Sequence, residues 1–189
     1  RCDNDYTYFC TPVGADIFAA PGVDGIHYCM IEGFGELIFA ISPSNGVGEF
    51  VHPVARSFDD FLRLLLVCDG DAAIEQCWQW SQEQFDKFMG EQEVLPATKQ
   101  AAERLMEQTG LEPMELPYKY IRDLQKSFNY KSISFSEEYY DIVPPEDLAE
   151  PEEILCEQSA TPWAVYYEDN FWAEDHEGTP CEEISFEKH

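Results

Sequence analysis

The chain has 189 residues, 44% of them hydrophobic and 14% aromatic, which is enough to bury the core of one ordinary domain and excludes a disordered or fibrous chain. Its 38 acidic residues outnumber 11 Lys and Arg, and the formal net charge is −27. A field of this sign repels nucleic acids and anionic membrane surfaces and attracts basic proteins, although the charge also serves solubility alone in many proteins. The acids are concentrated late, because residues 132–187 contain 17 acids and no Lys or Arg.

The first 55 residues predict an antiparallel meander of short strands. Aromatic and β-branched runs alternate with turn residues, and the segments "PGVDG" (21–25) and "GFG" (33–35) are typical of hairpin connections. Pro53 limits the pairing of the last strand, because proline has no backbone N–H. The expected strands are residues 6–10, 15–20, 25–32, 36–42 and 49–55.

Residues 57–67 predict a helix that packs on this sheet. Ser57 is a favourable N-cap, and Asp60 stands where a capping-box residue reaches back to the cap amide. Asp59 and Asp60 also suit the positive end of the helix dipole. The expected inward stripe consists of Phe58, Phe61, Leu62 and Leu65.

Helical periodicity continues to residue 128. The next four helices are expected at residues 71–80, 81–89, 96–110 and 116–128. The second of these carries a capping box of Ser81 and Gln84, and the third ends at Gly110. Ala101, Ala102, Leu105 and Met106 are expected to face inward.

After Tyr130, residues 132–136 predict a strand, and residues 161–178 predict two short strands around "EDN". We therefore expect an α+β fold: a twisted, mainly antiparallel sheet packed against helices, with a helical and acidic C-terminal extension. The expected parts are an α+β domain with a helical middle at 1–140, an acidic loop rich in Pro and Glu at 141–160, and an aromatic, acidic hairpin region at 161–189 that packs on the same domain. Because the chain starts at Arg1 and ends in "EISFEKH", structure is expected to be missing at both ends.

The stretch 15–67 resembles the SUKH superfamily, which groups yeast Smi/Knr-type cell-wall regulators with bacterial immunity proteins. The resemblance lies in "GIHYCMIEGFGELIFAISP" and in "FVHPVARSFDDFLRLLL". There Ser57, Phe58, Phe61 and Leu62 occupy the "SF-x-x-FL" helix start of that family. The family's opening helix and "LP-x-D" segment are absent, and residues 71–189 are not explained by the resemblance. The resemblance implies an α+β binding module that is not an enzyme; bacterial members typically neutralise a toxin, often a nuclease, by binding it.

Cysteine usage indicates a reduced, cytoplasmic protein. The seven cysteines are odd in number and show no C-x-x-C pair, and Cys29 and Cys68 lie in apolar runs. No apolar run approaches the ~18 residues of a membrane-spanning helix, and no signal peptide is visible.

Candidate chemistry is sparse. His27 and Cys29 share one face of a strand, but His52, His176 and Cys181 are too scattered to complete a typical zinc site, and we expect no metal and no cofactor. A Cys–His nucleophile would pair Cys29 or Cys68 with His52, yet neither thiol has a basic setting that lowers its pKa. Adjacent carboxylates such as Asp59–Asp60, Glu137–Glu138 and Glu182–Glu183 leave open a hydrolase with a carboxylate site between sheet and helices.

The expected partner site is the late aromatic hairpin. Its aromatic side chains would anchor a basic protein, such as a toxin, while its acids steer association. An ordinary core for a small sheet is the alternative explanation of these aromatics, and a small-ligand or peptide sensor is the alternative function. The expected partner-binding residues are Trp163, Tyr166, Tyr167, Glu168, Asp169, Trp172, Glu174 and Asp175.

Overall fold

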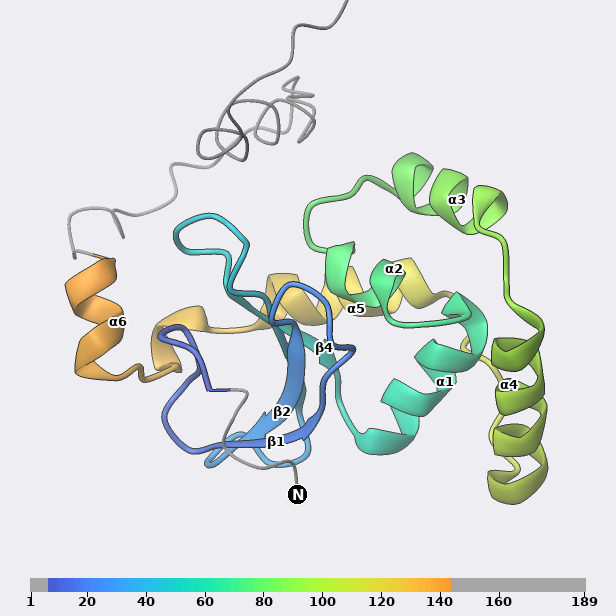
Figure 1. Cartoon of the computed structure of the whole chain (residues 1–189), viewed down its shortest axis with the longest axis horizontal. Helices are drawn as coiled ribbons and strands as arrows, with labels where there is room; N and C mark the ends of the chain where they lie inside the picture. Colours follow the sequence, from blue (N-terminus) through green and yellow to red (C-terminus); the bar gives the residue numbers. More distant parts are fainter. Residues whose placement is uncertain (1–6, 144–189) are drawn as a thin grey trace, which may run out of the picture. The chain divides into compact units, whose positions relative to one another are not determined.

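A four-stranded antiparallel sheet forms the centre of the fold (Figure 1). The computed structural model describes residues 7–143, and residues 1–6 and 144–189 lie outside this description. The strands follow the chain in the order β1-β2-β3-β4, which confirms the predicted meander and the α+β class. Their bounds are Ala15–Ala19 for β1, His27–Ile31 for β2, Ile38–Ile41 for β3 and Val51–Ala55 for β4.

The strand predicted at residues 6–10 is wrong. Residues 8–11 form a turn, which the Thr11 N–H closes by donating to the Tyr8 carbonyl at 2.9 Å. The aromatic run that suggested a strand instead supplies Phe9 and Cys10 to a core cluster on one face of the sheet. These side chains are thus buried without strand pairing. Strand propensity alone does not distinguish a paired strand from an unpaired segment that packs on a sheet.

Both faces of the sheet are covered. Alternation along β2 and β3 directs Tyr28 and Ile38 to one core cluster and Cys29 and Phe39 to the other. An antiparallel sheet with one solvated face would alternate apolar and polar residues. Here β3 is apolar throughout because neither side meets water.

Helices cover the face that carries Tyr28. The sheet-facing helices are α1 (Phe58–Cys68), α2 (Ala72–Gln76) and α5 (Pro117–Ser127). Ser57 caps α1 as predicted, because its hydroxyl accepts the Asp60 N–H at 3.2 Å. Phe61, Leu64 and Ile121 are buried in this cluster.

The predicted inward stripe of α1 is partly wrong. Phe61 is buried as expected, but Phe58 is 48% exposed, and Leu62 and Leu65 are only half-buried. The buried stripe is rotated toward Leu64 and includes Phe61, Leu64 and Cys68. Since α1 is apolar over most of its circumference, its periodicity did not decide which side faces the sheet.

Irregular segments and a short helix cover the opposite face. Residues Phe128 and Ile133 and helix α6 (Glu137–Ile142) pack there with Phe9 and Cys10. Figure 1 shows α6 on the other side of the sheet from α1.

The strand predicted at 132–136 is wrong. A 3-10 helix occupies Tyr130–Ser132, and residues 133–136 have no strand partner. The Ser134 carbonyl accepts a single backbone hydrogen bond, from the Val13 N–H at 2.8 Å. Ile133 is buried and Ser134 is exposed, so the residues alternate as in a strand although no ladder forms.

Two further helices, α3 (Gln82–Glu91) and α4 (Pro96–Thr109), differ in how much they contribute to the core. Helix α3 has the predicted capping box of Ser81 and Gln84 and buries Phe85. Helix α4 ends at Gly110 as predicted, with φ 70°, but it contains no buried residue.

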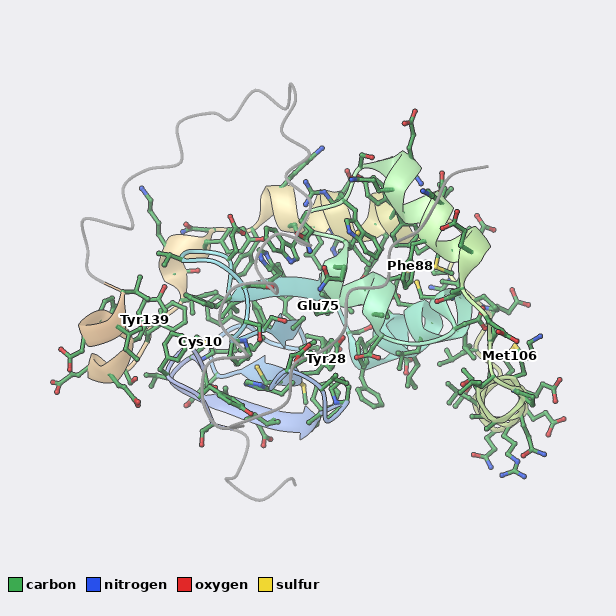
Figure 2. All side chains as sticks on the ribbon, turned by 45° about the horizontal axis from the view of Figure 1, so that its top comes forward. Cys10, Tyr28, Glu75, Phe88, Met106 and Tyr139 are labelled. Carbon is green, nitrogen blue, oxygen red and sulfur yellow. The ribbon has the colours of Figure 1, made fainter. Side chains whose placement is uncertain are left out.

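The expected inward face of α4 is therefore only partly buried. Ala101 is exposed, Ala102, Leu105 and Met106 are half-buried, and no α4 side chain joins either core cluster. Figure 2 shows α4 nearly end on, with side chains around its circumference and Met106 labelled on it. In the part of the chain that is described, no helix is both long and apolar enough to cross a membrane.

Candidate functional site

The predicted partner site lies outside the described residues. The eight residues from Trp163 to Asp175 fall after residue 143, as do His176, Cys181 and the regions 144–160 and 161–189. The predictions for these segments stay predictions. The candidate site described below comes from residues 7–143 alone.

A hollow of about 270 Å³ lies where the β2–β3 turn meets the start of α1. It is lined by Met30, Glu36, Ser57, Phe58 and Asp59. The turn is tight because two glycines in "GFG" adopt positive φ values, 93° and 67°, which side chains with a Cβ disfavour. This turn places Glu36 beside the first turn of α1, where the extended backbone of Ser57 starts the helix.

An exposed aromatic side chain borders the hollow. The Phe58 ring contacts the Phe18 ring edge-on at 5.6 Å, and Phe18 in turn contacts the buried Phe61 at 5.8 Å. Phe58 is therefore held by the core on one side while about half of it remains in water. Exposed aromatic side chains whose other side packs against the protein core are typical anchors of protein interfaces.

Two carboxylates of the hollow have no partner among residues 7–143. Glu36 and Asp59 are exposed, and neither forms a hydrogen bond or ion pair within this range. Asp60 differs, because it accepts from the Tyr120 hydroxyl at 2.7 Å and pairs with Arg63 at 3.4 Å.

The surroundings of these two carboxylates are also acidic. Residues 7–55 contain no Lys or Arg at all. Arg56 follows directly, but its guanidinium lies over the Tyr120 ring at 5.3 Å. Asp16 faces Met30 across the β1–β2 ladder and adds a third exposed acid on this side of the sheet. The hollow therefore combines an apolar wall with two carboxylates that have no ion-pair partner among residues 7–143.

A second polar cluster surrounds His52 on β4. The centroid of its ring lies 4.8 Å from that of the Trp78 ring, and the two rings are stacked. Its Nε2 lies 3.0 Å from the Glu49 carbonyl oxygen and 3.2 Å from a Glu49 carboxylate oxygen. Its Nδ1 lies 3.4 Å from the Tyr130 hydroxyl. Burial raises the pKa of Tyr130, and the nearby Glu49 carboxylate adds to this rise while Arg122 opposes it. Sequence reasoning missed this cluster because two of its members, His52 and Tyr130, are 78 positions apart.

Arg122 connects this cluster to α5. Its guanidinium donates to the Trp78 carbonyl and, at 3.0 Å, to the Gln125 side-chain oxygen. The indole N–H of Trp78 and the amide nitrogen of Gln125 are buried without a partner among the described residues. The arrangement ties β4, the end of α2 and α5 together, and its role is that of a structural network.

His27 is a buried neutral side chain. Its Nδ1 lies 2.8 Å from the Gly25 carbonyl oxygen, which only accepts, so Nδ1 carries the hydrogen and Nε2 accepts from the Thr11 hydroxyl at 3.1 Å. Burial lowers the pKa of His27, although the bond to Gly25 opposes this shift. Both ring nitrogens are occupied, and no group of three or more His, Cys, Asp or Glu within the described residues is placed to hold a metal ion.

The described cysteines are poor nucleophiles. Cys29 and Cys68 were the candidates, and burial raises the pKa of each to about 12. The same holds for Cys10 and Cys77, so that a thiolate is disfavoured at all four positions near neutral pH. We refer to Cys10, Cys29, Cys68 and Cys77 as the four buried thiols.

A buried carboxylate lies between the sheet and α2. Glu75 is 2% exposed; one of its oxygens accepts from the Ser42 hydroxyl at 2.5 Å and the other from the Gln76 amide. Nearby, the Tyr28 hydroxyl donates to Asp71 at 3.2 Å. Burial raises the pKa of Tyr28, and the charges of Asp71 and Glu75 raise it further.

The comparisons with known proteins add no relative. No family model matches the chain, and neither a curated protein nor a solved structure matches it. The α+β fold and the geometry of the hollow therefore stand on the structure alone.

Proposed function

We propose that this protein is a non-enzymatic binding module that recognises a basic protein partner. The observation that carries the proposal is the hollow beside Phe58, where a half-exposed aromatic ring lies next to the unpaired carboxylates of Glu36 and Asp59. A Lys or Arg side chain from a partner fits this chemistry, because two carboxylates and an aromatic face all attract a cation.

The negative field supports the same proposal. Complementary charge accelerates association, whereas a desolvated aromatic anchor slows dissociation. In this proposal the acidic surface steers the partner and Phe58 contributes to the lifetime of the complex. The aromatic and acidic residues at 163–175 belong to the proposal as a second contact region.

The resemblance of residues 15–67 to the SUKH superfamily supports a toxin as the partner. In this proposal the chain is a SUKH-like immunity protein of a bacterial cytoplasm, and the basic partner is a toxin that it neutralises. The four buried thiols fit a reducing compartment, since all are free rather than paired in disulfides.

The test is capture from a native lysate followed by measurement with the purified partner. The double variant Glu36→Gln with Asp59→Asn removes both carboxylates of the hollow. Its control is Glu103→Gln with Glu107→Gln on α4, which removes the same charge from exposed positions of a helix that joins neither core cluster.

We expect the hollow variant to bind about 3- to 30-fold more weakly and the α4 variant to bind nearly as well as wild type, because exposed ion pairs contribute about 0.2–1 kcal/mol each and more when partly desolvated. Affinity should also fall steeply between low and physiological salt. Equal affinities of the two variants, or a partner without basic character, would refute the proposal.

A hydrolase with a carboxylate site between sheet and helices is the second candidate, because Glu75 occupies that place in a buried setting. Both of its oxygens already accept hydrogen bonds from neighbouring side chains, which favours a structural role. A hydrolase activity that Glu75→Gln abolishes without unfolding the protein would reverse this ranking.

A further inference from the structure

The two edges of the sheet are not equivalent. At one edge, β4 contains Pro53, is buried at all five positions and has α5 packed along it. Its register with β3 also shifts next to Pro53. These are the devices that prevent a further strand from pairing with a sheet edge.

The opposite edge, β1, has no second strand partner among residues 7–143, and we call it the open edge. Its residues are half-buried or exposed, and no backbone group of residues 16–19 forms a hydrogen bond to any described segment other than β2. The strand contains no Pro, Lys or Arg, and its protection is limited to a register shift between Ile17 and Ala19 and to the charge of Asp16. An edge of this kind is able to accept an added strand.

Charge selects among possible occupants. A second copy would bring together two chains of formal net charge −27. A basic segment would not be repelled by residues 7–55, because they contain no Lys or Arg. It would be attracted by Asp16, which lies on β1 itself. The edge therefore disfavours self-association and favours a basic strand.

The open edge is continuous with the hollow. Phe18 of β1 contacts the exposed Phe58, and Asp16 faces Met30, which lines the hollow. In an added strand, alternate side chains point to this same face. Lys or Arg at those positions would lie beside Asp16 and extend toward Glu36 and Asp59.

We infer that the partner docks by adding an extended basic segment of about five residues, matched to the length of β1, to the open edge of the sheet. Its backbone pairs with β1, and its basic side chains occupy the face that leads to the hollow. This inference rests on the proposed function and specifies how the partner is held.

The test uses a synthetic probe and the full chain. The probe is the blocked hexapeptide acetyl-Lys-Val-Arg-Val-Lys-Val-amide, compared with two analogues that are N-methylated either at the three valines or at the three basic residues. The N–H groups of a strand point alternately to its two sides, so only every second residue of the peptide donates to β1. N-methylation of one set of residues therefore removes these donors, whereas methylation of the other set leaves them. Both analogues keep the charge of the parent peptide. Affinities are measured by calorimetry at low salt, and hydrogen exchange locates the peptide.

We expect one analogue to bind at least tenfold more weakly than the parent, and the parent to slow amide exchange at residues 15–19 but not in α4. A charge reversal, Asp16→Lys, should weaken the parent peptide several-fold, whereas Glu107→Lys on α4 changes net charge equally and should have less effect.

Three outcomes overturn the inference: both analogues bind as the parent does, exchange at 15–19 stays unchanged at saturation, or the parent does not bind. The proposed function is decided separately, because it depends on how the natural partner responds to loss of the carboxylates at 36 and 59.

Discussion

Two phenylalanines three positions apart in α1 provide a sharp test of which side chains belong to the core. Phe61 is 4% exposed and its ring lies 5.0 Å from that of Tyr28, whereas Phe58 is 48% exposed and contacts the ring of Phe18. We expect Phe61→Ala to lower the free energy of unfolding by about 3–5 kcal/mol, as for other buried phenylalanines.

Phe58→Ala should cost much less. Complete burial of such a side chain contributes about 1.5–3 kcal/mol, and Phe58 buries about half of its surface, so the expected loss is about 1 kcal/mol. Alanine also has the better helix propensity, which offsets part of this loss by a few tenths of a kcal/mol.

The assay is urea denaturation followed by circular dichroism, with the slope m checked in each variant so that the comparison remains two-state. Equal destabilisation by the two substitutions would show that Phe58 is a core residue. The same result would remove the aromatic anchor from the proposed docking surface.

Three further outcomes follow from buried polar groups. The pKa of His27 is lowered in the folded state, so the unfolded chain binds a proton first as pH falls below about 6.5. The contribution of neutral His27 to stability should therefore be complete above that pH and be lost below it. The decrease in urea midpoint between pH 7.5 and 5 should accordingly be smaller in His27→Gln than in wild type. Ser42→Ala leaves one oxygen of the buried Glu75 carboxylate without its donor and should lower the free energy of unfolding by about 1–3 kcal/mol in the same denaturation assay. A loss below about 0.5 kcal/mol, which is the ordinary effect of a surface substitution, would argue against this hydrogen bond. At pH 8, iodoacetamide should label the four buried thiols only after denaturant is added, as peptide mass spectrometry would show, and rapid native labelling would contradict their burial.

Local chemistry was sufficient to predict the elements whose partners are near in sequence. The hairpins around residues 21–25 and 33–35 connect strands that are adjacent in the chain, and the meander follows from them. The Ser57 cap and the Ser81 capping box each satisfy backbone groups within three residues. No tertiary information was needed for these features.

The errors arose where a pattern needs a distant partner. Residues 6–10 and 132–136 have strand-like composition, yet the described residues 7–10 and 132–136 form no ladder, and Phe9 and Ile133 pack against the sheet. The apolar positions of α4 are spaced as in a core helix, but none of them is fully buried and none joins a core cluster. Periodicity shows which residues share a face and does not show what that face meets.

The candidate site was beyond sequence reasoning for the same reason. Helical spacing predicts that Phe58 faces inward, and the position of Asp59 in the first turn is explained by the helix dipole alone. Only the β2–β3 turn, more than 20 residues earlier in the chain, brings Glu36 beside them. The exposed fraction of Phe58 then distinguishes an anchor from a core residue, and no single-sequence pattern reports that quantity.

The way in which the second face of the sheet is closed limits how this protein can be shortened. Phe39 and Ile41 are fully buried there beneath Cys10 from one end of the described chain and Ile133 and Tyr139 from the other. A version that stops after Ser127 would keep the four described strands and the helices α1 to α5, yet it would leave an apolar sheet surface in water. Such a fragment should aggregate during expression, so practical truncations must keep residues 128–143.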